Sequence, residues 1–231
     1  MLFDVIRSLA YGQHVDVWAV LAQVLSVVFV ILCILPLHEF AHGWVANKLG
    51  DPTAKLECRL TLNPLASVDP MGALALILFG FGWAKPVPVN PSRFKRPKLG
   101  MTLTALAGPV ANFLLSFVLI FVAVLLQVAL PGQRVALAVA EFFLQTGILS
   151  VGLGVFNLIP IPPLDGSRVL QALLPGRLYY KFFNYQVYFQ IALLVLLFLG
   201  ALNGLVATLQ IDMLNLIIRG VSGLLDLFGV V

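Results

Sequence analysis

Long apolar runs dominate the pattern of hydrophobic and polar positions in this chain. A transmembrane helix needs about 20 predominantly apolar residues to cross the hydrocarbon core of a bilayer. Four runs reach that length and predict four transmembrane helices: residues 17–37, 102–130, 135–158 and 187–205. Polar residues interrupt the last part of the chain, so residues 207–231 are expected to form an amphipathic helix at the membrane surface rather than a span. Residues 1–14 are expected to lie at the interface as well.

The segment between the first two runs has a different pattern. Residues 56–63 alternate between apolar and polar side chains, which predicts a β-strand. Residues 71–83 are apolar but too short to span, which predicts a re-entrant loop. Residues 85–91 are extended and rich in proline, which confines a strand to the edge of a sheet. An edge strand beside an active site can pair with the backbone of an unfolded substrate.

The composition agrees with an integral membrane protein. Of the 231 residues, 61% are hydrophobic and 10% are charged, and the mean hydropathy is +1.02. Soluble domains carry about 45–50% apolar and about 25% charged residues. The predicted fold is therefore an all-α polytopic membrane protein, a single domain over residues 1–231 with its core at about 17–185.

Basic residues gather beside one end of each predicted span. Those on the side of the loops at 48–100 and 160–185 are Lys48, Lys55, Arg59, Arg93, Lys95, Arg96, Lys98, Arg168, Arg177 and Lys181. Because cytoplasmic loops carry an excess of lysine and arginine, these loops are expected in the cytosol and the N-terminus outside, in a cell membrane. The cytosolic ends of the first and third spans are then expected at the same depth.

The most informative motif, His38-Glu39-Phe40-Ala41-His42, stands at the end of the first run. On a helix, His38 and His42 project from one face, where two imidazoles can bind one metal ion while Glu39 handles a proton. A lone histidine in an apolar helix is usually a packed residue. Ionisable residues inside a membrane are costly, however, and they mark functional sites. The motif therefore predicts a zinc site for water chemistry inside or beside a bilayer.

A third protein ligand is expected because catalytic zinc usually has three, with one open position. His14 lies on the opposite side in the predicted topology, so the third ligand should be a carboxylate. The candidates on the cytosolic side are Asp51, Glu57, Asp69 and Asp165. Asp165 is favoured because the prolines within residues 160–163 unwind the third span just before it. Its alternative role is an N-cap for a helix over residues 166–174.

Three motifs resemble the site-2 protease family, peptidase family M50, of intramembrane zinc metalloproteases. The first is the His-Glu motif. The second, residues 157–166, is similar to the family's Asn-Pro-Pro-Leu-Asp-Gly segment, and the third, residues 107–112, is similar to its Ala-Gly-Pro-Asn element. Weaker matches at 50–54, 59–64 and 85–90 keep the family order. The sequence shows no PDZ insertion or CBS domain, so it resembles a compact member.

The resemblance implies an intramembrane endopeptidase with one Zn²⁺ per chain. Its metal ligands would be His38, His42 and Asp165, and Glu39 would be the catalytic base. The implied partners are a membrane-spanning protein substrate and the lipid bilayer, with no nucleic acid; the oligomeric state is left open. A zinc transporter or a metal-stabilised membrane scaffold would also explain the ligands, but neither gives Glu39 a role.

Two amide side chains are further candidates for catalysis. Asn112 belongs to a ridge of small and polar residues on the second span, with Thr104, Gly108 and Ser116 at intervals of four. Such a ridge also serves close packing of helices. Asn157 lies late in the third span. The resemblance places Asn112 near the substrate or zinc, and either amide is expected to stabilise the developing oxyanion.

Overall fold

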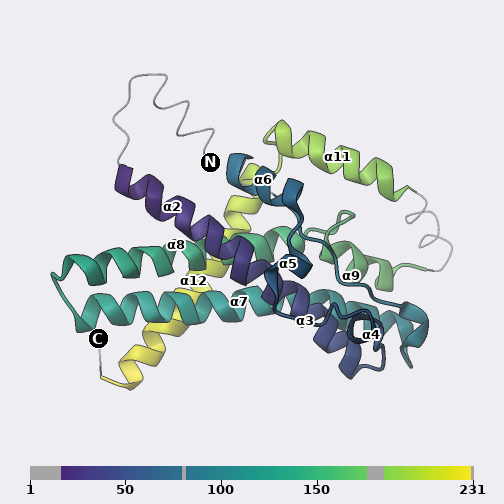
Figure 1. Ribbon diagram of the computed structural model, residues 1–231, viewed down its shortest axis with the longest axis horizontal. Helices are drawn as coiled ribbons and strands as arrows, with labels where there is room; N and C mark the ends of the chain where they lie inside the picture. Colours follow the sequence, from purple (N-terminus) through teal and green to yellow (C-terminus); the bar gives the residue numbers. More distant parts are fainter. Residues whose placement is uncertain (1–16, 80–81, 176–184, 230–231) are drawn as a thin grey trace.

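A computed structural model describes residues 17–79, 82–175 and 185–229 (Figure 1). All the elements within these ranges are helices, which confirms the predicted all-α class. Four helices are long and apolar enough to cross a membrane: residues Gln23–Lys48, α7 (Pro97–Ala129), α8 (Arg134–Asn157) and α12 (Asn203–Leu227). The first three confirm predicted spans, although the first helix continues to Lys48 rather than ending near residue 37.

The predicted fourth span over residues 187–205 is wrong. Helix α11 (Gln186–Phe198) has 13 residues, which at about 1.5 Å each cover about 20 Å of an apolar core about 30 Å thick. Gly200, with φ of +68°, then turns the chain in a conformation that favours glycine. The last helix long enough to span is α12 instead, which covers most of residues 207–231. The interfacial position expected for these residues stays a prediction. Residues 1–14 lie outside the described residues.

The strand predicted over residues 56–63 is wrong as well. Helix α4 (Thr53–Leu56) ends there, and the N–H groups of Arg59 and Leu60 both donate to the carbonyl of Ala54, at 2.8 and 3.1 Å. These local bonds fold the chain back on itself, and α5 (Pro64–Ser67) follows. The described residues contain no β-strand, only an isolated antiparallel bridge between Val68 and Ala84.

The apolar segment predicted to be re-entrant begins as α6 (Pro70–Phe79). A Cβ atom on Gly72 would lie 2.0 Å from the carbonyl oxygen of Trp83, so the chain returns along its own helix. Insertion of this segment into a bilayer stays a prediction. Of residues 85–91, predicted as an edge strand, 85–90 run extended but form no ladder, and Pro91 begins the short 3₁₀ turn η2 (Pro91–Arg93).

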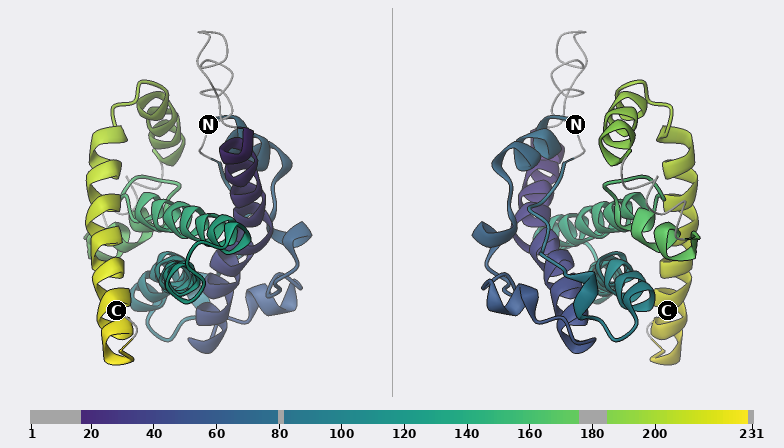
Figure 2. Two further views of the ribbon diagram at one scale, coloured as in Figure 1. Left: turned by 90° about the vertical axis from the view of Figure 1, so that its left-hand side faces the viewer. Right: turned by 90° about the vertical axis from the view of Figure 1, so that its right-hand side faces the viewer.

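Helix α7 is the centre of the structure. It lies antiparallel to α8, and the views in Figure 2 show α12 on one side of this pair and the first helix on the other. Buried Ile120 of α7 packs with Val151 of α8 and Ile217 of α12. The amide of Gln210 on α12 also donates to the carbonyl of Ile148, at 3.2 Å. That bond satisfies a polar group within an otherwise apolar interface.

The first long helix contains a widened turn just before the histidines. It consists of α2 (Val17–Phe29), the π-helical turn η1 (Val30–Ile34) and α3 (Leu35–Lys48). The N–H of Leu35 reaches back five residues to the carbonyl of Val30. Pro36, which follows, has no N–H to donate, and a wider turn accommodates that missing bond without breaking the helix. The turn lies immediately before the part of the helix that packs against α7.

Candidate metal centre

The two histidines of the motif face one point from adjacent turns of α3. Their Nε2 atoms are 3.0 Å apart, which confirms the geometry predicted from their spacing. Nδ1 of His42 lies 2.7 Å from the carbonyl oxygen of Thr104 on α7. A carbonyl only accepts hydrogen bonds, so Nδ1 carries the proton and the lone pair of Nε2 is directed into the site.

Asp165 reaches the same point from a distant part of the chain. It begins α9 (Asp165–Leu173), after the proline-rich break that follows α8. Its Oδ2 atom lies 3.2 Å from Nε2 of His38 and 3.1 Å from Nε2 of His42. Burial alone would raise the pKa of this carboxyl, but the adjacent imidazoles hold the pKa below its usual range. The carboxylate is therefore available as an anionic ligand.

These residues fit a bound zinc ion. His38, His42 and Asp165, called the ligand group below, offer one atom each within 4.8 Å of one another. The Oδ2 atom of Asp165 is buried and lies close to both imidazoles. Even so, it has no hydrogen-bond partner among the described residues, which leaves it available to a metal ion. Three ligands at about 2.1 Å from a tetrahedral metal would lie about 3.4 Å apart, close to the separations observed. Two imidazoles and one carboxylate are a donor set that zinc uses in hydrolases.

Gly108 brings α7 against the ligand group. A Cβ atom at this position would lie 2.3 Å from Nε2 of His42 and 2.5 Å from Cε1 of His38. No side chain larger than hydrogen fits there. The ridge of small residues predicted on the second span thus has a specific purpose at this position: it allows the backbone of one helix to touch the metal ligands of another.

Glu39 lies beside the ligand group without belonging to it. It is buried, and its Oε2 accepts a hydrogen bond of 2.9 Å from the backbone N–H of Val87. Glu39 and the ligand group line a cavity of about 680 Å³, whose walls come from α3, residues 82–89, α7, the end of α8, the start of α9 and α11. The carboxylate therefore belongs to the wall of the same cavity as the ligand group.

The two predicted amides occupy different positions. Asn157 lines the cavity, and its Nδ2 donates to the carbonyl of Leu153 at 3.0 Å. Asn112 is fully buried on α7 away from the cavity lining, and within the described residues its Nδ2 has no hydrogen-bond partner. The roles of Asn112 and Asn157 in catalysis stay predictions.

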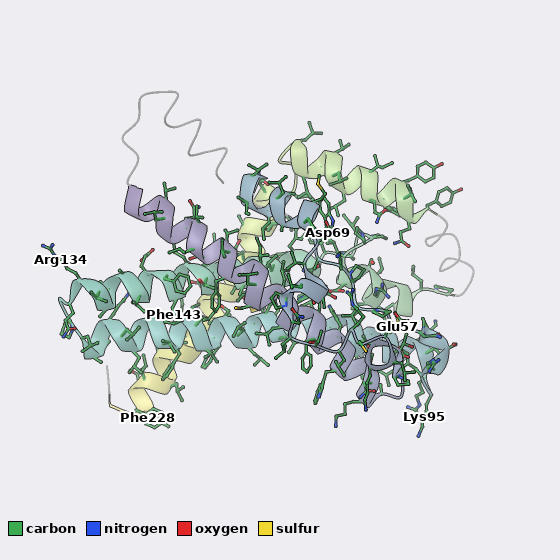
Figure 3. The ribbon with its side chains drawn as sticks, in the orientation of Figure 1. Glu57, Asp69, Lys95, Arg134, Phe143 and Phe228 are labelled. Atoms are coloured by element: carbon green, nitrogen blue, oxygen red, sulfur yellow. The ribbon has the colours of Figure 1, made fainter. Side chains whose placement is uncertain are left out.

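The other carboxylates considered as ligands have different structural roles. Asp51 is fully buried and accepts from the backbone N–H groups of Thr53 and Asn90. Asp69 accepts from the first N–H groups of α6, and Glu57 is exposed at the surface (Figure 3). The contact of Glu39 with Val87 could not be predicted from the sequence, because the donor is a backbone N–H, which every residue except proline has.

Comparisons with known proteins agree with this geometry. The family model described as "Peptidase family M50" matches residues 127–199. YwhC of Bacillus subtilis, whose name assigns it provisionally to the zinc metalloproteases, is 42% identical over 69% of this chain and 74% of its own length. Zinc metalloprotease MJ0392 of Methanocaldococcus jannaschii is 31% identical over 74% of this chain and 39% of its own length.

Rip2 of Mycobacterium tuberculosis, provisionally named in the same way, is 31% identical over 73% of this chain and 61% of its own length. No solved structure gives a significant match. The similarity to YwhC extends over most of both chains, and the family match covers the region that leads from α7 through the Asp165 segment. The chain therefore belongs to peptidase family M50, the site-2 protease family of zinc metalloproteases.

Proposed function

We propose that this protein is a zinc-dependent endopeptidase that cleaves a peptide bond within or beside a transmembrane segment of a membrane-tethered protein. The observation that supports it best is the convergence of the ligand group and Glu39 on one cavity, between helices long enough to cross a bilayer. A site in this position gives a hydrolase access to peptide bonds at membrane depth.

The chemistry follows from the His-Glu motif of the zinc-hydrolase type. Zinc held by the ligand group would supply Lewis-acid chemistry, because it lowers the pKa of water and polarises a carbonyl group. Glu39 accepts the proton of the attacking water and returns it to the leaving amine. Its Oε2 is held by the N–H of Val87, while its other oxygen has no hydrogen bond among the described residues and is free for the proton transfer.

The substrate must unwind before it is cut, because the amides of a helix are bonded internally. The extended residues 84–90 border the cavity and offer backbone groups to an unwound segment. The N–H of Val87 is already engaged by Glu39, and Pro86 and Pro88 have none. Pairing with substrate therefore falls to the N–H of Val89 and to the carbonyl groups of this segment that Arg59 does not bind.

The active site is proposed to face the cytosol of a cell membrane. Lys95 lies at the end of the molecule near α3 and α4, whereas Arg134 lies at the opposite end (Figure 3). Because most of the basic loop residues share the end that bears Lys95, the positive-inside rule assigns that end to the cytosol. Water then reaches the buried site from the cytosolic side.

Replacement of Glu39 by glutamine tests this function. Wild-type protein in liposomes should cleave single-span reporters whose apolar helix is interrupted by glycine and asparagine and carries a tag at each end. Glu39→Gln should keep one zinc per chain, measured by elemental analysis, and lose cleavage, whereas His38→Ala should lose both. Cleavage at the wild-type rate by Glu39→Gln would refute the assigned base. Zinc flux into wild-type liposomes without reporter cleavage would favour the transporter instead.

A further inference from the structure

The extended residues 84–90, called the strap below, cross the cavity side of α3 and are fixed at both ends and in the middle. At the first end, Ala84 forms the bridge to Val68, and the N–H of Lys85 donates to the carbonyl of Ser67 at 2.8 Å. At the other end, the N–H of Asn90 donates to Oδ2 of Asp51 at 2.6 Å. The strap is thus an anchored element beside the site.

The middle of the strap is the part that touches the catalytic machinery. The N–H of Val87 donates to Oε2 of Glu39, and the side chain of Val87 is buried against α3. Gly43 permits this close approach, because a Cβ atom there would lie 3.2 Å from Cγ1 of Val87 and 3.2 Å from Cδ1 of Leu60. A displacement of the strap would therefore move the donor that holds Glu39.

Arg59 clamps the strap immediately before this donor. Its Nη2 donates to the carbonyls of Lys85 and Pro86, at 2.9 and 3.2 Å. The backbone of Arg59 is itself fixed, because its N–H donates to the carbonyl of Ala54 at 2.8 Å. The two carbonyls belong to successive peptide groups, so a guanidinium that binds both fixes the orientation of one group relative to the other. The peptide group of the Pro86 carbonyl also carries the N–H of Val87.

Asp51 provides the second clamp. This carboxylate is fully buried, and one of its oxygens accepts from the backbone N–H and the hydroxyl of Thr53, next to α4. The other oxygen accepts from Asn90 of the strap. Asp51 therefore ties the strap to the same short turn that holds Arg59.

We propose that Arg59 and Asp51 are positioning residues, which clamp the strap from both sides of Val87 and so hold the Glu39 carboxylate in its working orientation. This inference rests on the proposed function of Glu39 as the proton acceptor. Neither residue touches the ligand group, so the clamp acts on the proton transfer and not on metal binding. Catalytic groups need such outer support, since a misplacement of about 1 Å can cost about 100-fold in rate.

Hydrogen exchange of the strap amides tests the clamp without a substrate. Pro86 and Pro88 carry no amide hydrogen, so mass spectrometry of this segment reads a small number of sites. In wild-type protein the amides of Lys85, Val87 and Asn90, which have acceptors, should exchange slowly. Val89, whose N–H has no partner among the described residues, should exchange fast. In Arg59→Met, the Val87 amide should lose its protection.

Kinetics with the cleaved reporter test the consequence for catalysis. Arg59→Met keeps the length of the side chain and removes the donor, so kcat should fall at least 10-fold while KM stays within about threefold. Arg59→Lys, whose ammonium can also bridge two carbonyls, should retain more of the wild-type kcat. Lys55→Met is the matched control: its cation is exposed and makes no hydrogen bond or ion pair among the described residues, so its removal should leave kcat unchanged.

Zinc content and thermal unfolding separate positioning from folding. All three variants should keep one zinc per chain and the wild-type unfolding midpoint. If Arg59→Met folds poorly, Gly43→Ala displaces the strap by a few tenths of an ångström without a change of charge, and it should also expose the Val87 amide. Asp51→Asn, which places an amide N–H against that of Asn90, should release the far end of the strap.

The outcomes distinguish this inference from the proposed function. If Arg59→Met retains the wild-type kcat and a protected Val87 amide, the clamp is refuted. A fall in kcat that is matched by loss of zinc or of thermal stability would also overturn it, because the role would then be structural. If wild-type protein cleaves no reporter, the proposed function fails, and the exchange of Val87 alone decides whether Arg59 holds the strap.

Discussion

Replacing Gly108 by alanine should weaken zinc binding strongly and leave the helices in place. The added Cβ would lie 2.3 Å from Nε2 of His42 and 2.5 Å from Cε1 of His38, whereas non-bonded carbon atoms settle at about 3.5–4.0 Å. Roughly 1 Å of movement is therefore required. His42 cannot simply rotate away, because its Nδ1 donates to the carbonyl of Thr104. Thr104 lies on α7, one turn before Gly108.

The magnitude of the effect follows from the tolerance of metal sites. Metal–ligand distances vary by only about 0.2 Å, so a shift of roughly 1 Å removes one or both imidazoles from the coordination sphere. Loss of an outer hydrogen-bond partner already costs about 10–100-fold in metal affinity. Displacement of the ligands themselves should cost more, so Gly108→Ala should weaken zinc binding by at least about 100-fold.

The assay is a chelator competition on purified protein, with circular dichroism as the measure of helix content. Gly223→Ala on α12 is the control, because nothing lies within 4 Å of a Cβ atom there. That variant should bind zinc like wild type. If Gly108→Ala retains wild-type zinc affinity, α7 does not approach the histidines as described, and the site geometry is wrong.

Three further variants test other contacts. Asp165→Ala should weaken zinc binding by more than about 100-fold, because loss of a residue that only supports a ligand already costs about 10–100-fold. If Asp165 served only as a helix cap, the zinc affinity would be unchanged. Gly147→Ala would bring a Cβ atom within 2.9 Å of Ile120, and overpacking of this kind should lower the free energy of unfolding by about 1–3 kcal/mol, read by chemical or thermal unfolding in detergent. Gln210→Leu should cost only about 0.6 kcal/mol in the same measurement, because interhelical hydrogen bonds in membranes are weak on average.

The spans that could be predicted from the sequence are those whose apolar runs end at strong breaks. The run over 102–130 ends at Pro131-Gly132, and α7 ends at Ala129; the third run ends before a cluster of prolines, and α8 ends at Asn157. The fourth run failed because apolar side chains continue through the turn at Gly200. Hydropathy reports the preference of side chains for an apolar environment, and it does not register a change of backbone direction within an apolar stretch.

The strand over residues 56–63 failed for a related reason. Alternation of apolar and polar residues indicates a strand only where the backbone is free to pair with another strand. Here the carbonyl of Ala54 captures two N–H groups, and Cys58 adopts a left-handed conformation with φ of +54°. Leu56 and Leu62 are exposed, so the alternation does not mark a buried face.

The metal site divides in the same way into local and distant parts. The spacing of His38 and His42 predicts a shared face because both stand on one helix, whose geometry is fixed by its own hydrogen bonds. Asp165 could be preferred only indirectly, from the depth at which the first and third spans end and from the prolines that unwind the third span just before it. The structure supplies the missing link in α7, which packs against both α3 and α9.

Helix α7 explains how two parts of the chain separated by more than a hundred residues form one site. Thr104 fixes the tautomer of His42, and Gly108 makes room for both imidazoles, so each turn of this part of α7 performs a separate task for α3. The same helix supports α9, which presents Asp165. A metal site assembled against one central helix retains its shape as long as that helix keeps its register. This is why a single methyl group on Gly108 should lower the zinc affinity strongly, whereas the replacement of Gln210 should lower the free energy of unfolding only slightly.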